Sequence, residues 1–198
     1  RLRSALRTFR DVLEPSWAAS LRDALRWLAD DLGAVRDAEV LRDRIRSREP
    51  LLPESDRQSL VDLLKTLEDT RDEARERLLE GMRSPRYVSL LEDLVAAARE
   101  PRVLEEIADE RAATALLPIL DAPWKHLKSA LDQASEDPSD ASLHAARIRA
   151  KRVRYAAEAV TPVFGKRAAN LAKAAADLQE VLGEHQDSVV ARAWLRGV

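Results

Sequence analysis

Apolar residues recur at the three- and four-residue spacing of an amphipathic helix along nearly the whole chain, and this periodicity constrains the fold more than any other feature. Only 5 glycines occur among 198 residues, and Ala, Leu, Arg, Glu and Asp dominate, as in other helical proteins. β-Branched and aromatic residues are too few for a sheet protein. The sequence therefore predicts an all-α fold.

Prolines and two Leu-Gly steps divide this pattern into segments. Pro118 and Pro123 should kink or split the segment that contains them, because proline lacks the N–H of the helical hydrogen bond. The Leu-Gly steps at residues 32–33 and 182–183 predict two further breaks. The expected helices cover residues 1–13, 16–32, 35–48, 55–82, 86–99, 103–135, 140–161, 164–182 and 184–197.

A weak internal repeat organises these segments. Residues 1–3 match residues 152–154, and residues 32–37 match residues 182–187 at nearly the same offset. Each copy runs through a basic helix, a proline-containing turn, a second helix, a Leu-Gly break and a third helix. We therefore predict two related helical repeats, the first in residues 1–100 and the second in residues 101–198. Because the chain opens inside a helical pattern, we also expect a segment upstream of Arg1.

Charge is distributed unevenly although the formal net charge is only −2. Four arginines and no acid occur in residues 1–10, and five basic residues and no acid occur in residues 147–154. Acids concentrate instead between residues 54 and 80. The small net charge of the whole chain therefore conceals two strongly basic helices. The local electrostatic field, and not the net charge, decides which ligands a surface attracts.

The helix expected at residues 140–161 places its basic side chains beside an apolar face that must pack against a core. Like charges at helical spacing repel each other by roughly 0.2–0.5 kcal/mol per pair. No acid relieves this repulsion in the pattern, which indicates an external anion as the counter-charge. The alternative is an ordinary surface feature, or pairing with the acidic helix. The predicted apolar stripe comprises Leu143, Ala146, Ala150, Val153, Ala157 and Val160.

Several other kinds of site are excluded or disfavoured. There is no cysteine, which excludes disulfides, thiolate metal sites and cysteine nucleophiles. His185 shares no helix face with Glu184 and Asp187, so we predict no metal site. The carboxylates are scattered, and no glycine-rich phosphate loop occurs. We therefore expect a protein that is not an enzyme and has no cofactor.

The tryptophans expected to anchor cores are Trp17, Trp27, Trp124 and Trp194.

No apolar run approaches 18 residues and no signal peptide is evident, so we expect a cytoplasmic protein without a membrane partner.

Residues 143–155, Leu-His-Ala-Ala-Arg-Ile-Arg-Ala-Lys-Arg-Val-Arg-Tyr, resemble the signature of the CHAD family, the conserved histidine α-helical domain. Residues 178–187 resemble the family's second landmark, and residues 25–33 with Arg36-Asp37 resemble its first-repeat equivalent. Residues 124–128 are similar to the basic segment that precedes the second repeat. The resemblance covers essentially the whole chain. It implies a pseudo-twofold pair of helical bundles with basic residues on the surface between them.

The resemblance also implies binding of inorganic polyphosphate, often beside a triphosphate-processing domain or at polyphosphate granules. Two positions depart from the family pattern. The first-repeat histidine would lie eight residues before Arg1. Where the second repeat often carries a lysine before its Leu-Gln pair, this chain has Ala176, and Lys173 one turn earlier is the candidate substitute.

A linear phosphate polymer suits such a surface, because arginine forks grip phosphate oxygens and lysine supplies point charges. DNA recognition would add a reading helix or aromatic platforms, so nucleic acid is expected only as an adventitious ligand. The alternative function is a helical scaffold that docks an acidic protein or nucleic acid. The candidate polyphosphate-binding residues are Arg1, Arg3, Arg7, Arg10, Arg22, Arg26, Lys125, Lys128, His144, Arg147, Lys151, Arg152, Arg154, Tyr155 and Lys173.

Overall fold

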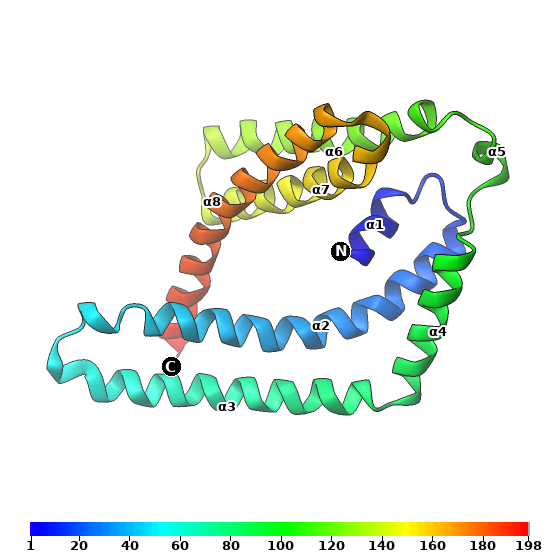
Figure 1. Cartoon of the computed structure of the whole chain (residues 1–198). Coiled ribbons are helices and arrows are strands. Elements are labelled where there is room, and N and C mark those ends of the chain that lie inside the picture. Colours follow the sequence, from blue (N-terminus) through cyan, green and yellow to red (C-terminus); the bar gives the residue numbers. More distant parts are fainter. Residues whose placement is uncertain (198) are drawn as a thin grey trace. The chain divides into compact units, whose positions relative to one another are not determined.

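The computed structural model describes residues 1–197, which form eight α-helices and two short 3-10 helices (Figure 1). No β-strand occurs within these residues, where extended pairing is limited to a bridge between Leu13 and Val103. The all-α prediction is therefore confirmed. The elements are α1 (Leu2–Thr8), α2 (Pro15–Arg46), η1 (Glu49–Leu51), η2 (Glu54–Asp56), α3 (Arg57–Met82), α4 (Pro85–Arg99), α5 (Glu105–Ala108), α6 (Ala112–Glu136), α7 (Asp140–Phe164) and α8 (Lys166–Gly197).

Both Leu-Gly steps lie inside continuous helices, so the two breaks predicted there are wrong. Gly33 belongs to α2 and Gly183 to α8, each a helix of 32 residues. A single glycine disfavours a helix by about 1 kcal/mol relative to alanine. Packing along a helix of this length offsets so small a penalty. The helices predicted at residues 16–32 and 35–48 are consequently one, as are those predicted at residues 164–182 and 184–197.

The segment predicted as one helix over residues 103–135 is split before its prolines and not at them. α5 ends at Ala108, and α6 begins at Ala112 and continues through Pro118 and Pro123. Burial of Ile119 on this helix compensates for the hydrogen bonds that the prolines remove. The first predicted helix is also too long, because α1 ends at Thr8.

The chain forms two compact units, each assembled from separate stretches of sequence. Unit 1 contains residues 1–22 and 97–186, and unit 2 contains residues 23–96 and the segment from Asp187 onward. α2 and α8 each run from one unit into the other. These units do not coincide with the predicted repeats of residues 1–100 and 101–198. Since a repeat concerns correspondence between sequences and a unit concerns spatial contact, the duplication stays a prediction.

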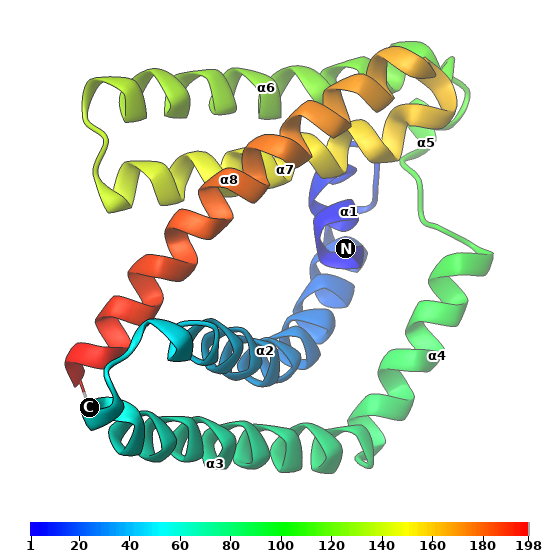
Figure 2. The ribbon, with the colours of Figure 1, turned by 60° about the vertical axis from the view of Figure 1, so that its left-hand side comes forward.

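The core of unit 1 lies where α7 packs against α6, α1 and the first half of α8 (Figure 2). The predicted α7 stripe is confirmed for Ala146, Ala150, Val153, Ala157 and Val160, which are at most 1% exposed, whereas Leu143 at its start is only half-buried. These side chains are small, which lets the neighbouring helices approach closely. Leucines of α6 and α8 surround the middle of the stripe.

Local signals fix the ends of α7. The hydroxyl of Ser139 accepts a hydrogen bond from the backbone N–H of Ser142, as expected of an N-cap. At the other end Gly165 has a φ of +62°, a conformation that side-chain-bearing residues rarely adopt. The helix that carries the largest share of the candidate binding residues is therefore bounded by its own sequence.

The core of unit 2 joins α2, α3 and the end of α8 through Leu41, Ile45, Leu60, Leu67 and Ala191. Each of these residues is at most 9% exposed.

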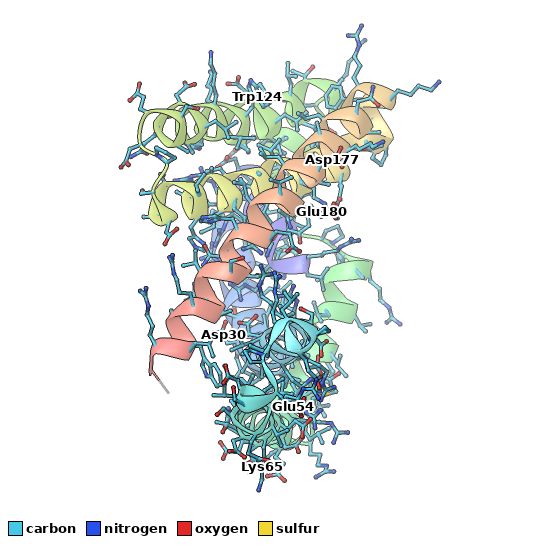
Figure 3. The ribbon with its side chains drawn as sticks, turned by 90° about the vertical axis from the view of Figure 1, so that its left-hand side faces the viewer. Asp30, Glu54, Lys65, Trp124, Asp177 and Glu180 are labelled. Carbon is cyan, nitrogen blue, oxygen red and sulfur yellow. The ribbon has the colours of Figure 1, made fainter. Side chains whose placement is uncertain are left out.

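Two of the four tryptophans show the range of their environments. In unit 2, Trp27 packs against Gly81, where a Cβ would lie 2.9 Å from the indole ring, and the guanidinium of Arg86 stacks 4.5 Å from that ring. Trp124 of unit 1 is instead 47% exposed on α6, so its predicted place in a core is wrong (Figure 3).

None of the helices within residues 1–197 combines the length and the apolar character needed to cross a membrane.

Candidate anion-binding site

A cavity of about 130 Å³ lies at the junction of α1, α6 and α7 in unit 1. Its basic lining comes from three predicted site residues, Arg7 and Arg10 of the N-terminal segment and Arg152 of α7. Its acidic lining is Asp11, which lies 3.2 Å from Nε of Arg10 and is thereby paired. The cavity therefore presents guanidinium donors without a matching number of acids. The remaining polar lining residues are Ser4, Thr8 and His126.

Arg152 is the most unusual cation of this cavity. Its Nε is buried and has no hydrogen-bond partner among residues 1–197. Burial lowers the pKa of the Arg152 guanidinium, and the positive charges of Arg149, Arg7 and Arg10 lower it further. Both causes disfavour the charged form, and the opposite charge of an anion in the cavity would favour it again. The geometry thus leaves a half-buried cation without its counter-charge.

Two further arginines of unit 1 share this condition. Nε of Arg147, on α7, and Nε of Arg22, on α2, are buried without a hydrogen-bond partner within the described part of the chain. α8 helps to cover Arg147, because a Cβ built on Gly183 would lie 3.6 Å from that Nε. One turn before Gly183, Oε1 of Gln179 is likewise buried and unsatisfied. Buried polar atoms without partners are uncommon in folded proteins, and here three of them belong to predicted site residues.

The second landmark, residues 178–187, holds the start of α7 in place. Nδ1 of His144 lies 2.8 Å from Oε1 of Gln186, and an amide oxygen can only accept, so Nδ1 carries the proton. Nε2 of His185 lies 3.3 Å from Oδ1 of Asp140. His144 therefore has a structural partner through one ring nitrogen, and only Nε2 is left for another contact. Residues 1–197 contain no group of three His, Asp or Glu side chains placed to hold a metal ion.

The expectation that no acid relieves the basic face of α7 is wrong at Arg154. Its Nε donates to Oε1 of Glu158 at 2.8 Å, and this hydrogen bond raises the pKa of Arg154. The Lys151 ammonium and the Arg154 guanidinium lie 5.9 and 5.8 Å from the ring centroid of Tyr155, within cation–π range. On α6, Lys125 pairs with Asp121 at 2.6 Å. These cations are partly neutralised within the fold.

The other predicted site residues do not line the cavity. Arg1 and Lys128 are exposed on unit 1, Arg3 is half-buried there, and Lys173 is exposed on α8. Arg26 lies on the part of α2 that belongs to unit 2 and is not among the residues that line the cavity.

Sequence reasoning missed four residues that the structure places at or beside the cavity. Ser4 and Thr8 stand one turn apart on α1, and the three-residue spacing of Ser4 and Arg7 was the available signal. His126 lies in the predicted basic segment, and Arg149 lies in the basic run of α7 but was not selected.

Comparison with known proteins places the chain in a family. It matches the CHAD domain over residues 1–196. Two uncharacterized proteins of Mycobacterium tuberculosis, Rv2226 of strain H37Rv and MT2285 of strain CDC 1551, are 37% and 36% identical over 207 residues. These alignments cover 98% of this chain but only 38% of each relative, so the chain corresponds to well under half of the length of these proteins.

Solved structures agree with this assignment. The CHAD domain from the plant Ricinus communis superposes with a TM-score of 0.72 at 33% identity, covering 98% of this chain and 64% of that one. PptA from Streptomyces chartreusis superposes with a TM-score of 0.79 at 23% identity over 96% of this chain and 70% of that one, which shows a shared fold. The chain therefore belongs to the CHAD domain family.

Proposed function

We propose that this domain binds inorganic polyphosphate through the basic surface of unit 1, centred on the cavity that Arg7, Arg10 and Arg152 line. The observation that carries the proposal is Arg152, whose buried Nε has no partner among the described residues and whose neighbours are further arginines. Structural arginines of this kind normally pair with an acid of the same protein. A ligand that supplies the missing negative charge explains why the arrangement persists.

The chemistry of the lining favours phosphate over a carboxylate. Guanidinium groups match the tetrahedral oxygens of a phosphoryl group with paired donors, and the hydroxyls of Ser4 and Thr8 add neutral donors. Charge density along a linear polyphosphate then extends the contact to cations outside the cavity, among them Arg147 and Lys151 of α7.

Binding without catalysis is part of the proposal. Hydrolysis of a phosphoanhydride requires a group that activates water, either a positioned base or a metal-bound hydroxide. The acid that lines the cavity, Asp11, is paired with Arg10 and is therefore not free to position a water molecule. Ser4 and Thr8 of the lining are neutral hydroxyl donors, and among the described residues no carboxylate of the lining orients the ring of His126 as a base. We also propose a cytoplasmic location, at polyphosphate granules or beside a triphosphate-processing domain, as the family resemblance implies.

Competition between polyanions tests the proposal. Isothermal titration with polyphosphate of defined length should give saturable binding, and polyphosphate should displace duplex DNA and polyglutamate of equal total charge. Equal or tighter binding of polyglutamate would favour the scaffold function, in which the basic surface docks an acidic protein. The matched control is Lys65→Met, which removes an exposed cation from α3 of unit 2 and should leave binding unchanged (Figure 3).

A further inference from the structure

Unit 2 carries a second basic cluster, distinct from the residues that sequence analysis selected. The ends of α2 and α8 come close to each other in unit 2 (Figure 2). Residues of both helices line a cavity of about 390 Å³. Arg44 and Arg48 come from the end of α2 and the turn after it, and Arg192 and Arg196 come from α8. None of the described residues that line this cavity is acidic.

The cluster is built into the core of unit 2. Ile45 and Ala191, which also line the cavity, are buried in the hydrophobic cluster that joins α2, α3 and α8. This packing fixes the two helix ends against each other. On α8, Arg192 and Arg196 are spaced four residues apart, so they stand on one face, while Arg44 is in the last turn of α2 and Arg48 is in the turn that follows it. Four arginines therefore line one cavity beside two buried residues of the unit 2 core.

Helix polarity explains only part of this arrangement. Carbonyl groups at a helix C-terminus attract cations with about 0.3–1 kcal/mol, which accounts for some basic residues in a last turn. Two neighbouring arginines of α2 have acidic partners in the fold, since Arg42 pairs with Asp43 at 2.7 Å and Arg46 pairs with Glu68 at 3.3 Å. Arg48 and Arg196 form no ion pair with any of residues 1–197 and are exposed at the opening.

We infer that this cluster is a second oligophosphate-binding site, which takes phosphoryl groups through Arg48 and Arg196. Arg44, which donates to the hydroxyl of Ser188, lines the same opening. The class of ligand is taken from the proposed function, on which this inference rests. The residues of the second site, however, belong to unit 2, whereas the cavity of the proposed function lies in unit 1. A guanidinium pair at an open rim binds a flexible phosphate chain by its charge and forked donors and requires no enclosed pocket.

Nuclear magnetic resonance of the guanidinium Nε–Hε groups tests the site directly. Titration of the full chain with tripolyphosphate should shift the resonances of Arg48 and Arg196 in a saturable way. The Arg48→Gln and Arg196→Gln double variant should weaken this second binding event at least about tenfold, as expected for the loss of charge-assisted hydrogen bonds. The matched control is Arg75→Gln with Arg77→Gln, two exposed arginines on α3 of the same unit.

The outcomes separate this inference from the proposed function. If the resonance of Arg152 shifts and those of Arg48 and Arg196 do not, the second site is refuted and the proposed function stands. If Arg48 and Arg196 shift while Arg152 does not, the second site stands and the cavity in unit 1 is refuted. Equal shifts with polyglutamate of the same charge would also refute the second site, because the cluster would then not select phosphate.

Discussion

Replacing Arg152 by methionine separates the ligand-binding role of this side chain from its structural role. Methionine has a similar unbranched stem, so the Arg152→Met variant keeps most of the packing of the half-buried side chain and removes only its charge and its donors. The wild-type guanidinium is disfavoured by burial and by the charges of Arg149, Arg7 and Arg10. In the absence of ligand, the variant should therefore be at least as stable as the parent protein.

The magnitude follows from the neighbours of Arg152. A like-charge pair at helical spacing, here Arg149 with Arg152, destabilises by roughly 0.2–0.5 kcal/mol, and repulsion of similar size from Arg7 and Arg10 of the N-terminal segment brings the sum to about 1 kcal/mol. For a chain of this length, that free energy corresponds to a rise of about 2–4 °C in Tm. Loss of charge-assisted hydrogen bonds to phosphate should remove about 1.5–3 kcal/mol of binding free energy, which weakens polyphosphate binding about 10- to 100-fold.

Thermal unfolding followed by circular dichroism and isothermal titration with polyphosphate measure the two effects separately. Lys65→Met on α3 serves as the control for a methionine in place of a cation. A fall of several degrees in the Tm of Arg152→Met would show that the guanidinium is a structural partner and would refute the reasoning from its unsatisfied Nε. Unchanged affinity in a folded variant would show that the cavity does not hold the ligand.

Three other predictions concern binding, catalysis and folding. The logarithm of the polyphosphate affinity should fall linearly with the logarithm of salt concentration, with a slope of about −0.7 per contact by analogy with single-stranded nucleic acids. The slope should be shallower by about that amount in Arg152→Met, and a flat response in the parent protein would contradict electrostatic binding. Purified protein incubated with polyphosphate, with and without divalent metal, should release no orthophosphate above background; turnover that follows the protein through purification would overturn the non-catalytic proposal. Ser139→Ala should lower stability by about 1 kcal/mol, or about 2–4 °C in Tm, because it removes the N-cap hydrogen bond of α7. Ser135→Ala, an exposed change on α6, should lower Tm by less than half as much, and equal losses would refute the capping argument.

Patterns within one helix could be predicted from the sequence alone. The apolar stripe of α7, its N-cap at Ser139 and its end at Gly165 depend on residues within a few turns of one another, so helical periodicity and capping chemistry suffice. The pairing of Arg154 with Glu158 is also local, at a spacing of four residues, and a closer reading of the same helix would have predicted it.

The candidate site depended on contacts that no local pattern encodes. Arg7 and Arg152 are far apart in the sequence and meet only because α1 packs against α7, and the cluster of Arg48 and Arg196 exists only because the ends of α2 and α8 share one core. Tertiary packing also overrode the helix-breaking tendencies of Gly33, Gly183 and the prolines of α6. Intrinsic propensities of about 1–3 kcal/mol per residue decide a helix end only where burial of an apolar face does not outweigh them. The sequence by itself therefore determined the helical class and the basic faces, whereas long-range burial of apolar surface decided which helices are continuous and which cations converge.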